Sequence, residues 1–255
     1  MIADTHYTPD TSTGDASSSR RETVSRSPSW RPMSAQPRAV IAIPEDAALV
    51  LIDMQLAFER PLWSYWSADG GTRNNPEAER VAARLLEKWR TTGRPVIHVR
   101  HDSTSMVSPL RARTPTSDFN PVVRPNGDEP VYHKHVDSAF VDTTLARDLR
   151  ARRLQTLVLV GFTTDHAVSS TARSAASLGF TVFVASDATA TFDREGPGGR
   201  SFPAELMHQT ALASLHEEFA IVATAGAILD GVAVSASEAN HRAHAPQARV
   251  SPAVR

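Results

Sequence analysis

The chain has 255 residues, of which 41% are hydrophobic and 22% are charged, and its formal net charge is −1. This length and composition are typical of one large globular domain with tails. The near-neutral charge excludes a global attraction to nucleic acid or acidic membranes, and no stretch approaches the roughly 20 apolar residues that span a bilayer. We therefore expect neither nucleic acid nor a membrane as a partner.

The chain contains no cysteine. Disulfides, thiolate metal sites and cysteine nucleophiles are therefore excluded in the sequence as written. A chain without cysteine is compatible with the reducing cytoplasm, which is the location that we expect.

The two ends of the chain differ in composition from its middle. Residues 1–40 are rich in small polar residues, Pro and Arg, so they cannot bury enough apolar surface to offset the entropy of ordering. We predict a disordered or loosely docked arm at 1–40, a folded domain at 41–232 and a flexible tail at 233–255.

Between these ends, short apolar runs alternate with amphipathic segments. Strands are predicted at 47–53, 95–100, 130–136, 156–161, 181–185 and 219–223, and helices at 76–89, 143–152, 164–178 and 203–216. Continuously apolar strands are typical of a sheet that is covered on both faces, and their alternation with helices indicates parallel pairing. The predicted fold class is α/β: a three-layer, doubly wound, mostly parallel six-stranded sheet with helices on both faces.

Three features fall at the carboxyl ends of the predicted strands, where ligands bind in open α/β sheets. Asp53 closes the first strand, Lys134 lies at or near the end of the third, and residues 161–167 join the fourth strand to a helix. The unpaired N–H groups and the dipole of that helix favour an anion near Ala167. A thiol at this position would be activated by the helix, by an ammonium and by a carboxylate that takes its proton.

Each of these features also has a purely structural interpretation. An Asp at a strand end is often a loop anchor, a Lys after a strand often faces solvent, and an Ala in a first helical turn needs no special explanation. From the residues alone, both interpretations stay open.

Six segments of the chain resemble the isochorismatase-like (cysteine hydrolase) family. They are LVLIDMQLAF at 49–58, GRPVIHVRHDS at 93–103, EPVYHKHVDSAF at 129–140, GFTTDHAVSSTAR at 161–173, SDATATFDR at 186–194 and LASLHEEF at 212–219. The likeness covers roughly residues 45–230 in order, and collinear motifs make it specific.

The resemblance implies a cysteine–aspartate–lysine triad, which maps onto position 167, Asp53 and Lys134. It also implies a cis peptide bond between Phe162 and Thr163. The loop that this bond shapes, and that would receive an oxyanion, comprises Phe162, Thr163, Thr164, Asp165 and His166. The residues that we expect to line a substrate pocket are Gln55, Phe58, Trp63, Trp66 and Phe140.

Ala167 stands where the family carries its cysteine. One explanation is a deliberate Cys-to-Ala inactivation, and the other is a natural pseudoenzyme. Asp53, Lys134 and the Thr-Thr-Asp-His segment before position 167 are all intact. This favours the first explanation, because a pseudoenzyme no longer under selection for catalysis would lose some of these residues.

Histidines near the predicted site raise the question of a metal. Nicotinamidases of this superfamily bind one through an Asp-x-His motif, and His98, His101 and His133 are the candidates here, with His135 sharing a strand face with His133. The required spacing is missing, and structural histidines are the commoner case, so we predict no metal and no cofactor. The Gly-rich loop at 193–200 does not follow a strand, so we discount nucleotide binding and expect a flexible segment.

The resemblance implies a hydrolase that acts on a small-molecule amide, imide or ureido C–N bond, and streptothricin is one such substrate. Two alternatives stay open: a vinyl-ether hydrolase of the isochorismate type, and a binding protein without catalysis. The family also leads us to expect a homodimer or homotetramer.

Overall fold

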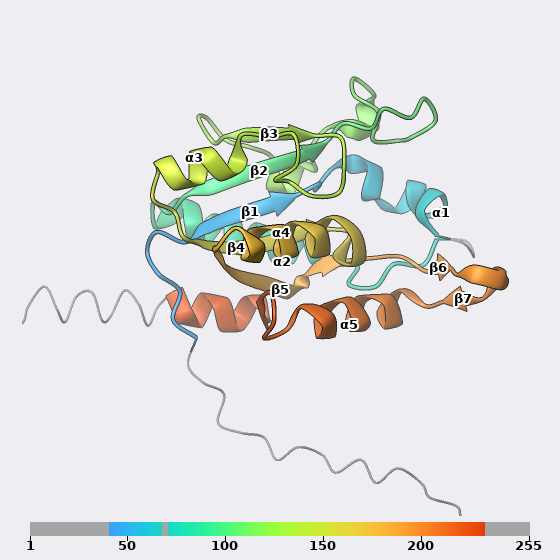
Figure 1. Cartoon of the computed structure of the whole chain (residues 1–255). Coiled ribbons are helices and arrows are strands. Elements are labelled where there is room, and N and C mark those ends of the chain that lie inside the picture. The colour runs from blue at the N-terminus through green and yellow to red at the C-terminus, as the bar shows by residue number, and fades with distance from the viewer. Residues whose placement is uncertain (1–40, 68–70, 233–255) are drawn as a thin grey trace, which may run out of the picture. The chain divides into compact units, whose positions relative to one another are not determined.

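A computed structural model describes residues 41–67 and 71–232 of the chain. The arm predicted at 1–40 and the tail predicted at 233–255 lie outside the described residues. The central sheet contains β1 (Ala48–Ile52), β2 (Val96–His101), β3 (Val131–Lys134), β4 (Thr156–Phe162), β5 (Thr181–Ala190) and β8 (Ile221–Ala223). All neighbouring pairs are parallel, in the order β3-β2-β1-β4-β5-β8 (Figure 1). This confirms the predicted doubly wound fold.

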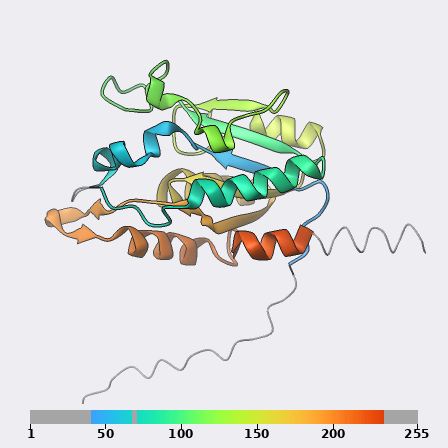
Figure 2. The same cartoon turned by 180° about the vertical axis from the view of Figure 1, so that it is seen from behind.

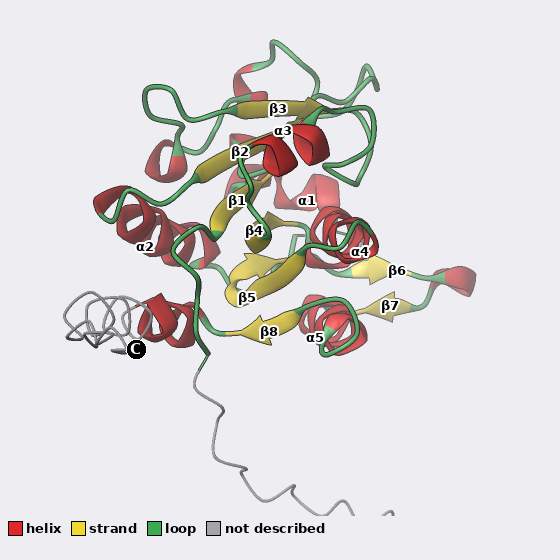
Figure 3. Ribbon diagram, turned by 60° about the vertical axis from the view of Figure 1, so that its left-hand side comes forward, coloured by secondary structure: helices red, strands yellow, loops and turns green. Residues whose placement is uncertain are grey.

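Helices cover both faces of the sheet (Figure 3). One face carries α2 (Ala78–Thr91) and a helix at 225–232, which Figure 2 shows from behind. The other face carries α3 (Leu145–Ala151), α4 (Ser169–Ser177) and α5 (Ala204–Leu215). In the described segments, no helix combines the length and apolar character that crossing a membrane requires.

Strand β1 explains why the central strands are continuously apolar. Leu49 and Leu51 belong to the core under α2, whereas Ala48, Val50 and Ile52 belong to the core under α3 and α4. Side chains alternate between the two faces of a strand, so a strand buried on both faces needs apolar residues at every position.

Several short elements surround the carboxyl edge of the sheet. They are η1 (Leu56–Phe58), η2 (Arg60–Leu62), α1 (Trp63–Trp66), η3 (Pro115–Ser117), η4 (Pro121–Val123) and the π-helical turn η5 (Thr164–Val168). The Gly-rich loop expected at 193–200 is instead part of a hairpin, formed by β6 (Arg194–Glu195) and β7 (Ser201–Phe202) around η6 (Pro197–Gly199). Figure 1 shows this hairpin beyond the carboxyl ends of the strands.

Gly161 brings the ends of β1 and β4 together. It pairs in register with Ile52 and has a φ of +121°. A Cβ atom at this position would lie 1.9 Å from the carbonyl oxygen of Ile52, so only glycine fits. The chain order reverses between β1 and β4, which makes their carboxyl ends the topological switch point where α/β folds place their sites.

Candidate active site

Asp53 and Lys134 form a buried ion pair at the carboxyl edge of the sheet. Nζ of Lys134 donates to Oδ2 of Asp53 at 2.6 Å, and the two residues are only 1% and 3% exposed. Lys134 is the last residue of β3 and Asp53 follows β1, with β2 between the two strands. Asp53 has a φ of +52°, which Asp tolerates better than most residues, and its N–H donates to the carbonyl of Val99.

Burial changes the acidity of Asp53. It raises the pKa of this carboxyl to about 6, although attraction and hydrogen bonding to Lys134 pull the pKa down. The Oδ1 atom has no hydrogen-bond partner within the described part of the chain. The carboxyl therefore has a free oxygen and a pKa that allows it to take or give a proton near neutral pH.

Two further contacts hold the ammonium of Lys134. Nζ lies 3.2 Å from the carbonyl oxygen of Val136 and 3.3 Å from Nδ1 of His101. Burial, followed by repulsion from Lys134, lowers the pKa of His101 to about 4. The ring is therefore neutral at pH 7, and its Nδ1 can accept from the ammonium.

The segment after β4 has the backbone that the family resemblance implies. The peptide bond between Phe162 and Thr163 is cis. The π-helical turn η5 follows, in which the N–H groups of His166 and Val168 both donate to the carbonyl oxygen of Thr163. Ala167 lies in this turn and is buried.

The side chains of this loop make long-range contacts. Thr163 makes no side-chain cap, and Oγ1 of Thr164 lies 2.9 Å from Nδ1 of the buried His208. Asp165 bonds to Thr191 and to Arg194, whose Nε lies 3.0 Å from Oδ2. The phenyl ring of Phe162 is buried against that of Phe58, with ring centroids 5.3 Å apart, and the side chain of His166 is 56% exposed.

Sequence analysis missed Arg194 and missed the contact that His208 makes with this loop. Arg194 belongs to the segment 186–194, which resembles the family, but no local pattern gives its partner. His208 lies in a predicted helix, and the structure places its side chain in the interior against the loop.

The loop after Lys134 is attached to the helix that follows Ala167. The N–H of Ala139 donates to Oγ1 of Thr171 at 3.1 Å, and Oγ of Ser138 donates to Oγ of Ser174 at 2.8 Å. Ala139 and Ala167 also belong to the same buried cluster. The segments that follow β1, β3 and β4 therefore meet at one edge of the sheet.

The five residues predicted to line a pocket lie in different surroundings. The amide of Gln55 is buried and bonds to the backbone of His101 and Ser117. Phe58 stacks on Trp66 at 4.7 Å, inside the core under α2. Phe140 stacks on Phe180 beside the opposite core.

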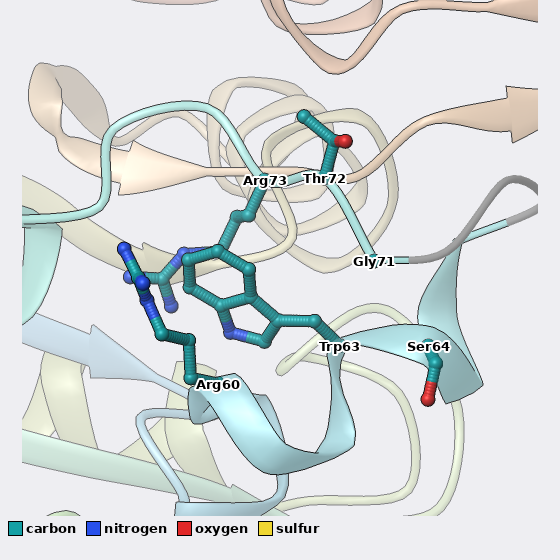
Figure 4. Close-up of a pocket in the computed structure, with 6 residues that line it drawn as sticks. All are labelled: Arg60, Trp63, Ser64, Gly71, Thr72 and Arg73. Carbon is teal, nitrogen blue, oxygen red and sulfur yellow. The ribbon is translucent and has the colours of Figure 1, made fainter.

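Trp63 lines a cavity of about 470 Å³ (Figure 4). The guanidinium groups of Arg60 and Arg73 lie near its indole, with their Cζ atoms 5.4 and 4.7 Å from the ring centroid. The lining residues are Arg60, Trp63, Ser64, Gly71, Thr72 and Arg73. Neither Asp53 nor Lys134 is among them, so this cavity is separate from the ion pair.

The candidate histidines have protein partners. His98 is fully buried and bonds to Glu129 at 2.8 Å, while Nδ1 of His133 lies 2.7 Å from Asp102. His101 contacts Lys134, as described above. Among the residues described by the structure, no group of three or more His, Asp or Glu side chains is placed to bind a metal.

The fold defines a doubly wound α/β protein with its candidate site at the carboxyl edge of the sheet, and comparisons with known proteins give its family. The isochorismatase domain model matches residues 47–227. The chain is 34% identical to the isochorismatase family protein YrdC of Bacillus subtilis, itself uncharacterized, over 73% of this chain and 96% of that protein. The chain therefore belongs to the isochorismatase family of hydrolases.

Two other relatives are informative. A crystal structure of an isochorismatase family protein from Chromobacterium violaceum is 37% identical, with a TM-score of 0.72, and the match covers 78% of this chain and all of that one. Streptothricin hydrolase of Streptomyces noursei is 32% identical over 71% of this chain and 63% of its own length.

Proposed function

We propose that this chain is the thiol-free form of an amidohydrolase that uses position 167, Asp53 and Lys134 as its triad. The observation that carries the proposal is the buried pair of Asp53 and Lys134. The pair lies at the switch point between β1 and β4, and the loop that contains Ala167 follows β4. A buried carboxyl with a pKa of about 6 and a free Oδ1 has the properties of a general base, and the ammonium beside it favours an anion nearby.

The reaction of the thiol-bearing form follows from these properties. The thiol at position 167 gives its proton to Asp53, and the sulfur attacks the carbonyl carbon of an amide. The C–N bond breaks as Asp53 returns the proton to the leaving nitrogen, which leaves a thioester. Water then hydrolyses the thioester to an acid and regenerates the thiol. Lys134 orients Asp53 throughout.

The substrate class that we propose is a small molecule with an amide, imide or ureido C–N bond. The likeness to streptothricin hydrolase supports an amide-containing antibiotic as one member of this class. Ala167 has a methyl group where cysteine has CH2–SH, so this chain has no sulfur to form a thioester. The intact Asp53 and Lys134 favour a Cys-to-Ala inactivation over natural drift.

The test is the Ala167→Cys variant, screened against a panel of amides, imides and ureido compounds with nitrogen release as the readout. We expect turnover with the variant and none with the parent chain. Ala167→Cys combined with Asp53→Asn is the matched control, because it keeps the thiol but removes the base. A variant that is inactive on the whole panel, or a control that is equally active, would overturn the proposal.

A second candidate is acid-catalysed cleavage of a vinyl ether, as in isochorismate. The free Oδ1 of Asp53 and its pKa of about 6 favour this candidate, because a protonated carboxyl can deliver a proton to the enol ether carbon without any thiol. Water then adds, and the product collapses to pyruvate and an alcohol. Pyruvate release by the unmodified chain, abolished by Asp53→Asn, would favour this candidate over the first.

A non-catalytic binding protein is the remaining outcome. It is indicated if Ala167→Cys gives no turnover of any amide and the unmodified chain releases no pyruvate from isochorismate.

A further inference from the structure

We propose that Arg194 is a positioning residue that acts through Asp165: it neutralises this buried carboxylate, two residues before position 167. This inference rests on the proposed function, because it assigns Arg194 to the support of the nucleophile position. Arg194 belongs to the β6–β7 hairpin and comes from a part of the sequence remote from the triad.

The side chain of Arg194 connects three segments of the chain. Its Nε donates to Oδ2 of Asp165 at 3.0 Å, and its Nη2 lies 3.4 Å from Oγ1 of Thr163. Nη1 lies 3.3 Å from the carbonyl oxygen of Trp66, which ends α1. Nη2 also lies 3.5 Å from Oγ1 of Thr191, which itself donates to Asp165. One guanidinium group therefore connects the end of α1 and the hairpin to Thr163 and Asp165.

The backbone next to Arg194 is held in place. Oδ1 of Asp193 accepts from the N–H of Ala204 at 2.7 Å, at the first residue of α5, and the N–H of Asp193 donates to the carbonyl of Thr72 at 3.3 Å. Arg194 is therefore presented from an anchored position, although the hairpin tip beyond it is exposed. A group held in this way loses little entropy when it positions another segment.

The charge of Asp165 makes the guanidinium necessary. The Asp165 side chain is only 7% exposed, and although burial raises its pKa, hydrogen bonding and attraction to Arg194 lower it below the ordinary value. Asp165 is therefore ionised, two residues before position 167. A thiolate at 167 would be repelled by an unneutralised carboxylate this close in the chain, and Arg194 removes that repulsion.

The experiment measures the thiol directly. In the Ala167→Cys background the introduced thiol is the only one, because the chain has no cysteine of its own. The rate of alkylation by iodoacetamide against pH gives the pKa of that thiol. We expect Arg194→Gln to raise this pKa by about one unit, because it removes the guanidinium beside the Asp165 carboxylate and leaves the exposed His166, 3.6 Å away, as its other ionisable neighbour.

The double variant separates electrostatics from structure. Arg194→Gln combined with Asp165→Asn removes both charges, so the thiol pKa is expected to return close to that of Ala167→Cys alone. Arg194→Lys, which keeps the charge, is expected to give a shift smaller than that of Arg194→Gln. Arg200→Gln is the matched control, because Arg200 belongs to the same hairpin and contacts Phe202 instead of the loop.

Two results would overturn the proposal: no shift in Arg194→Gln, or a double variant that stays shifted as far as the single one. Thermal unfolding of each variant checks that the fold is retained. Alkylation requires no amide turnover, so the result can be read even if Ala167→Cys hydrolyses nothing. Failure of the proposed function and failure of this inference are therefore distinguishable.

Discussion

Oδ2 of Asp53 and Nζ of Lys134 lie 2.6 Å apart, although the residues are 81 positions apart in the sequence. Both side chains are almost fully excluded from water. Burying two charges costs free energy, which their attraction offsets only while both are present. The pair is therefore a poor source of net stability, but neither member can be removed alone without a large effect.

We expect Lys134→Met to be strongly destabilising at alkaline pH and much less so at acidic pH. Burial already raises the Asp53 pKa from 3.8 to about 6. The native state therefore holds this proton more tightly than the unfolded state, and the contribution of Asp53 to stability falls as the pH rises from about 4 to about 6. Without the ammonium of Lys134, the pKa of Asp53 rises further, so the free energy of unfolding continues to fall above pH 6.

The measurement for Lys134→Met is urea unfolding at pH 5 and at pH 8. We expect the free energy of unfolding to drop by about 3 kcal/mol at pH 8 and by clearly less at pH 5. Lys134→Met combined with Asp53→Asn is the control, because it has no carboxyl to titrate and should lose the pH dependence. Equal destabilisation by Lys134→Met at both pH values would contradict the assigned pair.

The two candidate functions predict opposite pH dependence from the same carboxyl. As the base of an amidohydrolase, Asp53 must be ionised, so kcat/KM of Ala167→Cys is expected to rise as the pH increases through about 6. As the acid of a vinyl-ether hydrolase it must be protonated, so kcat/KM of the unmodified chain is expected to fall above about 6. The pH profile of whichever activity is found therefore identifies the role of Asp53, and a profile that is flat through pH 6 would exclude both roles.

The sequence allowed the sheet to be predicted, and with it the placement of Asp53 and Lys134 at one edge, because apolar runs and strand ends are local signals. Apolar runs end at Asp53 and at Lys134, and the carboxyl ends of parallel strands necessarily share one edge. Arg194 and His208 could not be assigned in this way, because they are 29 and 44 residues from their partners in the loop. Their contacts arise from tertiary packing.

Two local features also differ from expectation, for identifiable reasons. Apolar periodicity does not distinguish a π-helical turn from an α-helical one, so the helix predicted from Thr164 begins as η5 instead. The Gly-Pro-Gly-Gly composition of 196–199 is typical of a flexible loop, but the contact of Asp193 with Ala204 anchors one end of the hairpin there.

Gly161→Ala is expected to be one of the most damaging single substitutions in the chain. The added Cβ would lie 1.9 Å from the carbonyl oxygen of Ile52, in addition to the cost of a positive φ. Relieving that overlap would separate β1 from β4, so we expect a loss of roughly 3 kcal/mol or more in the free energy of unfolding.

Gly179→Ala is the matched control for Gly161→Ala. Gly179 has a φ of +90°, but a Cβ there would meet nothing within 4 Å. It should therefore cost only about 1 to 2 kcal/mol, from backbone conformation alone. Equal losses in the two variants, measured by urea unfolding, would show that the close approach to Ile52 is unimportant.

The contact between Thr164 and His208 gives the last prediction. Nδ2 of Asn75 lies 3.4 Å from Nε2 of His208, but the carbonyls of Ser186 and Thr189 are nearer, at 3.0 and 2.8 Å, and take its two hydrogens. Burial lowers the pKa of His208, so the ring is neutral, and the Ser186 backbone beside it acts as an acceptor. We therefore expect the ring proton on Nε2. The Thr164 hydroxyl then donates to Nδ1 across 2.9 Å.

Thr164→Val keeps the shape of this side chain but leaves Nδ1 of the buried His208 without a donor. An unsatisfied buried acceptor costs about 1 to 3 kcal/mol, which we expect as the loss in the free energy of unfolding. Thr164→Ser keeps the hydroxyl and should preserve both the bond and the Nε2–H tautomer, which nitrogen NMR of the imidazole reports. A valine variant as stable as the parent chain would contradict this assignment of the bond. So would a parent ring with its proton on Nδ1, because Nδ1 would then donate to the hydroxyl instead of accepting from it.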